Sequence, residues 1–152
     1  MNLNKVKYLY VGETHSNLKL DKDSEIESCQ EYKYLGVIFD TSGTEEKEIR
    51  SRVIQARKCI ACLNGILWSK DERNERKVNI YNALIKSSLL YGSETWRLTE
   101  NNKRRVEATE MDALRRSSRI SRKEKIINVT IRQQIGLEEA ITKETEKNQL
   151  TW

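Results

Sequence analysis

The sequence has 152 residues, of which 37% are hydrophobic and 34% charged, and it carries a net charge of +5 without a single proline. This length suits one domain better than two, and the low apolar share predicts a thin hydrophobic core. A charge-rich composition without proline favours helices with solvated faces. It disfavours a proline-rich linker and a β-sandwich with many turns.

The sequence also argues against a membrane-spanning or secreted protein. No run of about 18 apolar residues is present to span a membrane, and the N-terminus lacks the apolar stretch of a signal peptide. Three cysteines are an odd number for a disulfide framework. We therefore expect an intracellular protein, in the nucleus or cytoplasm, with reduced cysteines and no membrane partner.

The charge is unevenly distributed along the chain. Residues 1–48 carry a net charge of −4 and residues 136–152 a net charge of −2, whereas residues 49–135 carry +11. Such a basic block predicts contact with a polyanion. The alternative is that lysine and arginine, both good helix formers, cover solvated helix faces. Charge alone leaves the two interpretations open.

Residues 1–43 have the alternating pattern of β-strands. Strands are predicted at residues 5–11, 18–20, 26–29 and 32–39, the last rich in aromatic and β-branched side chains. Gly36 falls inside the last strand, which indicates a bulge or a close approach of a ligand to the backbone. We expect a small N-terminal antiparallel sheet of three or four strands.

From residue 44 the apolar spacing becomes helical. Steps of three and four residues predict one long helix with a core-facing stripe formed by Ile49, Val53, Ala56, Ile60, Leu63 and Leu67. Ser42 with Glu45, or Thr44, would cap its N-terminus. The basic side chains of this helix that lie off the stripe are Arg50, Arg57 and Lys58.

Further helices are predicted downstream. One extends from Asp71 to Tyr91, a third follows Thr99 as its N-cap, and a short fourth begins at Asn128 and ends before Gly136. The arginines that surround the apolar positions of the third helix are Arg104, Arg105, Arg115, Arg116 and Arg119. Residues 44–136 are thus expected to form a helical bundle, and residues 137–152 a polar, frayed helix. The fold class is α+β.

No catalytic motif is recognisable. The six glycines are too far apart for a phosphate-binding loop, and His15 has no catalytic partner by motif. Cys59 and Cys62 have the spacing of a zinc or redox pair and, with Cys29 and His15, would complete four ligands. Because the pair lies inside a strongly predicted helix, we interpret it as two small side chains beside the stripe. We predict no catalytic residue, no metal site and no cofactor.

Residues 32–39, Tyr-Lys-Tyr-Leu-Gly-Val-Ile-Phe, closely resemble the F-K-Y-L-G-x-x-F segment in reverse transcriptases of non-long-terminal-repeat (LINE-type) retrotransposons. Residues 56–58, 67–68 and 89–96 are similar to the A-R-K, L-W and L-L-Y-G-x-E-T-W blocks of that family, in the same order. Glu110-Met111, residues 114–116 and Gly136-Leu137 continue the resemblance, which covers nearly the whole chain.

The resemblance implies a position after the metal-binding aspartates of the polymerase. Residues 1–43 would be the end of the palm with a primer-grip-like hairpin, and residues 44–136 the helical thumb. Lys5 and Lys7 would correspond to a lysine-rich strand near the incoming nucleotide, although Val6 replaces the usual threonine. The partners implied are the RNA/DNA template-primer and the N-terminal fingers and palm. The predicted nucleic-acid-binding residues are Lys5, Lys7, Tyr34, Leu35, Gly36, Arg50, Arg57, Lys58, Arg104, Arg105, Arg115, Arg116 and Arg119.

The sequence also departs from the family pattern. The fingers, the palm core and the catalytic aspartates are missing, Glu138-Glu139 replace the usual prolines, and the chain stops before a glycine-histidine step. We therefore expect a polymerase fragment that holds the template-primer without catalysis, because Mg²⁺ would belong to the missing aspartates. The alternatives are a non-catalytic basic nucleic-acid-binding module and a decayed element fragment without a biochemical role.

Overall fold

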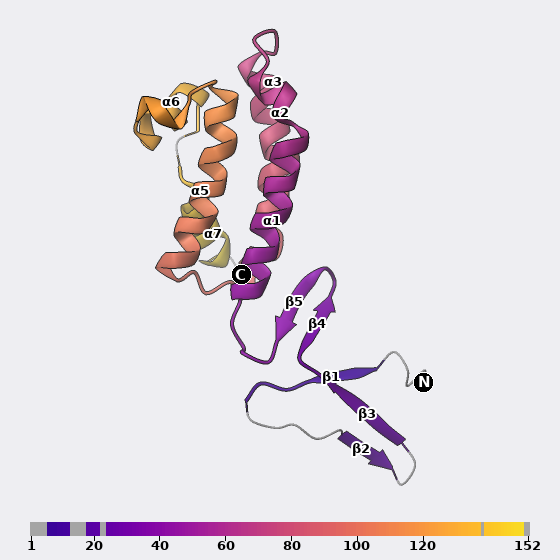
Figure 1. The fold of residues 1–152 in the computed structure, drawn as a ribbon. Helices are drawn as coiled ribbons and strands as arrows, with labels where there is room; N and C mark the ends of the chain where they lie inside the picture. The colour runs from indigo at the N-terminus through magenta and orange to yellow at the C-terminus, as the bar shows by residue number, and fades with distance from the viewer. Residues whose placement is uncertain (1–5, 13–17, 22–23, 138, 151–152) are drawn as a thin grey trace. The chain divides into compact units, whose positions relative to one another are not determined.

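The computed structural model describes residues 6–12, 18–21, 24–137 and 139–150. The chain divides into two units, Met1–Glu48 and Ile49–Trp152. Strands lie in the first unit and helices dominate the second (Figure 1). The predicted α+β class is confirmed. The boundary predicted between residues 43 and 44 precedes the first helix. The boundary between the two units lies inside that helix, between Glu48 and Ile49.

The first unit contains a three-stranded sheet with the strand order β1-β3-β2. Its strands are β1 (Lys7–Leu9), β2 (Leu18–Asp21) and β3 (Ser24–Cys29). β2 pairs antiparallel with β3, as predicted, but β1 pairs parallel with it. Alternation of side chains specifies the face that each residue occupies and carries no information on strand direction, so the sequence pattern did not predict the parallel pair.

A separate hairpin follows, formed by β4 (Glu31–Tyr34) and β5 (Val37–Asp40). Tyr34 pairs with Val37, which leaves Leu35 and Gly36 as a two-residue turn with φ angles of 46° and 85°. Two central residues with positive φ define a type I′ turn, whose twist matches that of the strands. Gly36 therefore lies in a turn, and the prediction that it sits within a strand was wrong.

Substituting Gly36 by alanine is expected to lower the free energy of unfolding by about 1 kcal/mol, because a Cβ atom is strained at a φ of 85°. Urea denaturation followed by circular dichroism measures the change. Leu35→Gly is the matched control, since it places glycine at a position that is already left-handed, and we expect it to be nearly neutral. Equal losses for both variants would contradict the turn assignment.

The outer edge of the hairpin is held by the first turn of α1 (Glu46–Cys62). Glu48 is buried, and its Oε2 accepts a 2.7 Å hydrogen bond from the backbone N–H of Ile38. Asp40 accepts hydrogen bonds from the backbone and hydroxyl of Ser42 and pairs with Lys47 at 3.2 Å. Although burial opposes ionisation, these contacts hold the pKa of Asp40 below its ordinary value. Side-chain carboxylates thus tie the hairpin to the start of the helix.

The regular elements of the second unit are all helical (Figure 1). Its remaining elements are α2 (Asn64–Trp68), α3 (Asn74–Ile80), the π-helical η2 (Tyr81–Lys86), α4 (Ser87–Leu89), the 3₁₀ turn η3 (Ser93–Thr95), α5 (Glu100–Ser117), the 3₁₀ turn η4 (Arg122–Glu124), α6 (Asn128–Ile135) and α7 (Ile141–Leu150). Within the described residues, none of these helices combines the length and apolar character needed to cross a membrane.

Several helix boundaries differ from the predictions. The helix expected to continue through Leu67 breaks after Cys62, and α2 begins at Asn64, where an Asn-Gly pair has low helix propensity. Leu67 is nevertheless fully buried, so the apolar stripe continues across the break. α3 begins at Asn74 with Arg73 as its N-cap residue, so the predicted helix start at Asp71 was wrong.

Two hydrophobic clusters form the core of the second unit. The first consists of Ile60, Leu67, Tyr81, Ile85, Met111, Ala113, Leu114, Ile120 and Ile131. The second consists of Ile49, Val53, Ala56, Leu89, Trp96, Val106 and Ile141. α1 and α5 contribute to both clusters, as the spacing of their apolar residues predicted. Thr99 caps α5, as expected, by accepting a hydrogen bond from the backbone of Asn102.

The C-terminal helix is packed, contrary to the expectation of a frayed tail. Ile141, Thr142 and Thr145 in α7 are buried. Thr142 donates a 2.7 Å hydrogen bond to Glu107 on α5, and Lys103 on α5 pairs with Glu146 at 2.7 Å. Two of the three buried side chains are threonines, so the apolar periodicity of this helix is weak although its inward face is covered.

Candidate nucleic-acid interface

The predicted interface residues of the first unit lie in β1 and at the hairpin tip. Lys7 is exposed and pairs with Glu27 at 3.8 Å, while Lys5 lies outside the described residues. At the tip, Tyr34 is 58% and Leu35 73% exposed, next to the half-buried Gly36. The sharp I′ turn therefore presents two large side chains to solvent.

The predicted cations of α1 lie away from its core stripe. Arg50, Arg57 and Lys58 are all exposed. Among the residues that the structure describes, the side chains of Arg57 and Lys58 have no hydrogen bond or ion pair. Arg52, one turn before, is buried and lies over the ring of Tyr91 at 4.5 Å. α1 therefore carries three exposed cations of the predicted set.

At the N-terminal half of α5 the two predicted arginines differ. Arg104 is exposed, whereas Arg105 is half-buried and donates a 3.4 Å hydrogen bond to Asn102 Oδ1. Arg104 lies on a helix that shares both core clusters with α1. We place it with Arg57 and Lys58 as an exposed cation of the helical unit.

The arginines near the C-terminus of α5 make internal contacts. Arg115 donates hydrogen bonds to the carbonyl of Ile126 at 2.6 Å and to Asn128 at 3.1 Å. Arg116 binds Asp112 on its own helix and Asn64 at the start of α2. Both guanidinium groups thus fasten neighbouring segments to α5. These two groups are therefore less available to bind a phosphate than the exposed cations are, because their internal contacts would first have to break.

Arg119 closes α5 and has a φ of 57°. The backbone N–H of Ile120 donates to the carbonyl of Arg115 at 2.9 Å, which is the long hydrogen bond of a Schellman motif. Glycine usually occupies the left-handed position of this motif. Because an arginine occupies it here, no residue type in the sequence indicated where α5 ends. The side chain of Arg119 is exposed and lies near Lys77; burial lowers the pKa of Lys77, and repulsion from Arg119 lowers it further.

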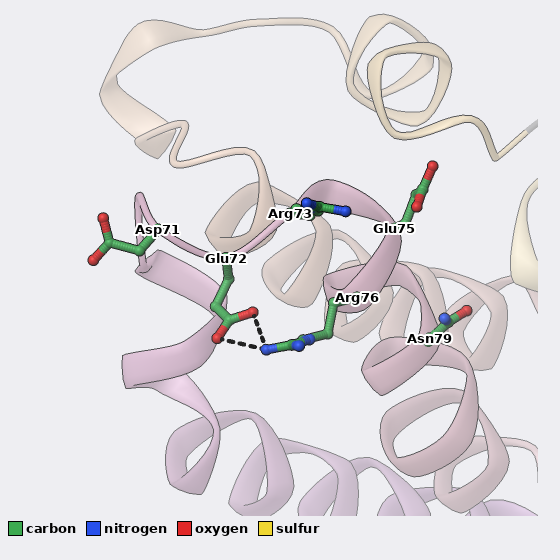
Figure 2. A pocket seen from close by; sticks show the side chains of 6 residues that line it. All are labelled: Asp71, Glu72, Arg73, Glu75, Arg76 and Asn79. Carbon is green, nitrogen blue, oxygen red and sulfur yellow. Dashed lines mark hydrogen bonds and ion pairs between the residues drawn. The ribbon is translucent and has the colours of Figure 1, made fainter.

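A shallow pocket at the start of α3 contains further charged groups (Figure 2). Its lining residues are Asp71, Glu72, Arg73, Glu75, Arg76 and Asn79. Arg76 binds both carboxylate oxygens of Glu72, at 2.9 and 3.1 Å. The lining holds three acidic and two basic side chains, so this pocket has no excess positive charge to attract a polyanion.

The cysteines are separated between the two units. Cys59 is half-buried and Cys62 exposed on α1, whereas Cys29 lies in β3 and donates a weak hydrogen bond to the carbonyl of Tyr8. Burial raises the pKa of the Cys59 thiol, with Cys62 adding to the effect. In the described ranges no three His, Cys, Asp or Glu side chains are grouped to hold a metal ion, and His15 lies outside those ranges.

No protein-family model matches the chain, and neither the curated proteins nor the solved structures contain a match to it. The likeness to reverse transcriptases therefore rests on the motifs quoted above. The candidate interface consists of exposed cations, Arg57, Lys58 and Arg104 foremost, on two helices whose apolar residues share both core clusters.

Proposed function

We propose that this chain is the region of a non-long-terminal-repeat retrotransposon RNA-directed DNA polymerase that holds the template-primer duplex, acting inside the cell together with the fingers and palm of the polymerase. The observation that carries the proposal is the exposed Arg57, Lys58 and Arg104 within a block of residues 49–135 that bears a net charge of +11. The order of the motifs along the chain supports it.

The chemistry proposed is contact with phosphates. Lysine and arginine contacts to the backbone supply affinity and position without reading sequence. The hairpin tip at Tyr34 and Leu35 would be placed near the primer end, as the family resemblance implies. The Mg²⁺ ions of polymerisation would be held by aspartates of the palm. A non-catalytic nucleic-acid-binding module would use the same cations, and a strong preference for an RNA–DNA hybrid over other duplexes favours the polymerase origin.

Reversing two charges in Arg57→Glu/Lys58→Glu is expected to weaken binding to an RNA–DNA hybrid at least tenfold. The slope of log K against log salt should also fall by about 2, since each phosphate that is no longer neutralised by a cation lowers that slope by about 0.9. Fluorescence anisotropy with a labelled hybrid at several salt concentrations measures both quantities.

The matched control is Lys123→Glu/Lys125→Glu, which changes the charge equally at two exposed residues in and after η4. We expect a smaller loss of affinity from it. Absence of binding by the native chain at low salt, or equal losses from the two double variants, would refute the proposed interface. A primer-extension assay with Mg²⁺ tests whether the chain alone has polymerase activity. Extension of the primer by this chain would contradict the proposal that it does not polymerise.

A further inference from the structure

Two cysteines occupy the last turn of α1. Cys59 and Cys62 are three residues apart, and the helix ends at Cys62. Cys59 is half-buried and packs against the first hydrophobic cluster, whereas Cys62 is exposed. Free cysteine is among the residue types most often buried, and an exposed thiol contributes little to packing. What distinguishes Cys62 from a serine or an alanine at this place is therefore its reactivity.

Helix geometry brings the two residues close to the spacing of a disulfide. Residues three apart in an α-helix have Cα atoms about 5 Å apart, which lies within the range of about 4.4–6.8 Å found in disulfides. Their Cβ atoms are about 5–6 Å apart, whereas a disulfide needs about 3.5–4.5 Å. The bond therefore requires only a local rearrangement of the last turn of α1.

The end of α1 is a place where such a rearrangement is possible. Leu63 lies in a turn after the helix, and α2 begins at Asn64. The backbone N–H of Leu63 donates to the carbonyl of Cys59 at 2.9 Å, at the point where α1 stops. The last carbonyls of a helix lack partners within it, so Cys62 is held by fewer backbone hydrogen bonds than a residue in the helix interior. A cysteine pair in the middle of α1 would not have this freedom.

We propose that Cys59 and Cys62 are a reversible dithiol–disulfide pair that peroxides oxidise. Cys62 Sγ attacks one oxygen of hydrogen peroxide, the O–O bond breaks, Cys62 becomes a sulfenic acid and one water leaves. Cys59 Sγ then attacks the sulfur of Cys62, the S–O bond breaks and a second water leaves. The two thiols together lose two protons and two electrons, and the peroxide is reduced to water.

The surroundings of the two thiols determine the order of these steps. A dissolved peroxide reaches Cys62 first because that residue is exposed. Burial raises the pKa of Cys59, with Cys62 adding to the effect, so less of the Cys59 thiol is present as the thiolate that attacks an oxidant. Attack on the neighbouring sulfenic acid needs no approach from solvent. Cys59 is therefore the thiol that resolves the sulfenic acid.

The third cysteine provides an internal reference. Cys29 lies in β3, is half-buried and donates a weak hydrogen bond to the carbonyl of Tyr8 at 3.4 Å. Its partner across the β1–β3 ladder is Leu9, so no cysteine faces it there. We expect its thiol to remain free under conditions that oxidise the pair.

Peroxide treatment of the reduced full chain, followed by alkylation with N-ethylmaleimide and mass spectrometry, tests the proposal. Trypsin cleaves after Lys58 and Lys70, so one peptide, residues 59–70, contains both thiols. We expect this peptide to become lighter by two hydrogens and to take up no maleimide, while Cys29 is still alkylated. Excess reduced glutathione should restore both thiols, because a strained and exposed disulfide is readily reduced.

Three serine variants assign the roles. Cys29→Ser is the matched control and should form the disulfide as the native chain does. In Cys59→Ser, the sulfenic acid on Cys62 should accumulate and be trapped by dimedone. In Cys62→Ser, the remaining Cys59 should react with peroxide roughly tenfold more slowly than Cys62 does in Cys59→Ser. Circular dichroism establishes that each variant is folded.

Several results would overturn the proposal. Two free thiols in residues 59–70 after peroxide treatment, a disulfide that joins either cysteine to Cys29, or oxygen added to Cys62 without loss of the two hydrogens would each exclude the pair. A disulfide that excess glutathione does not reduce would exclude its reversibility. None of these measurements involves nucleic acid, so failure of this proposal leaves the proposed function untouched, and the reverse also holds.

Discussion

Replacing Glu110 by alanine is expected to lower the free energy of unfolding by about 3–5 kcal/mol, the usual cost of removing one partner from a buried ion pair. Glu110 on α5 is 1% exposed and joins three other segments. Its carboxylate pairs with Arg132 of α6 at 2.5 Å and accepts hydrogen bonds from the Tyr81 hydroxyl at 3.3 Å and from the backbone N–H of Ile141 at 3.2 Å. Alanine would leave all three donors without this acceptor.

Two further variants distinguish the lost charge from the lost packing. Glu110→Gln keeps an acceptor oxygen and a similar volume, so a smaller loss is expected from it. In Glu110→Ala/Arg132→Met no unpaired buried guanidinium remains, and the double variant should be more stable than the sum of the single losses predicts. Urea denaturation measures all of these chains. A loss below about 1 kcal/mol for Glu110→Ala would show that this network of polar contacts contributes little.

The protonation of Glu110 gives the same network a pH dependence. Burial raises the pKa of Glu110, while the hydrogen bonds from Arg132 and Tyr81 act in the opposite direction. The folded chain therefore binds this proton at a higher pH than the unfolded chain. The stability of the native chain relative to Glu110→Gln should rise as the pH falls through the folded-state pKa, and become constant below the unfolded value. A difference that shrinks on acidification would contradict this direction.

Apolar periodicity predicted the core helices because it reports burial directly. Ile49, Ala56 and Ile60 recur at helical spacing and are each at most 1% exposed. The same criterion failed for Glu110 and Lys77, which are buried although their residue types are usually solvated. Their partners are remote in sequence, so no local pattern identifies them. The buried residues therefore include charged side chains that the 37% apolar share does not count.

The positive charge of the candidate interface could be predicted from the sequence, but the internal contacts of its basic side chains could not. Spacing correctly placed Arg57 and Lys58 on the outer face of α1. The same spacing predicted Arg115 and Arg116 as available cations, whereas their guanidinium groups bind Ile126, Asn128 and Asn64. Ile126 and Asn128 come close to Arg115 because the chain turns back after α5. Asn64 comes close to Arg116 because α5 packs on α2. A count of basic residues therefore overestimates the charge available to a ligand.

Lys77→Met is expected to lower the free energy of unfolding by about 2 kcal/mol, because two backbone carbonyls would lose their donor. Lys77 is 2% exposed, and its Nζ donates hydrogen bonds to the carbonyl of Ser69 at 2.7 Å and to that of Ser117 at 3.2 Å. The ammonium group thus ties the end of α2 to the C-terminus of α5, where the helix dipole favours a cation. Methionine restores part of the loss by removing a charge that is costly to bury.

The control and the pH dependence of this variant follow from its surroundings. Lys70→Met removes an exposed lysine near the same turn and should change stability by less than about 0.5 kcal/mol. Burial lowers the pKa of Lys77, and repulsion from Arg119 adds to the effect. The folded chain thus loses this proton at a lower pH than the unfolded chain, so the stability of the native chain relative to Lys77→Met should rise as the pH increases toward the unfolded value. Equal effects of the two lysine variants would show that the bridge between α2 and α5 does not stabilise the fold.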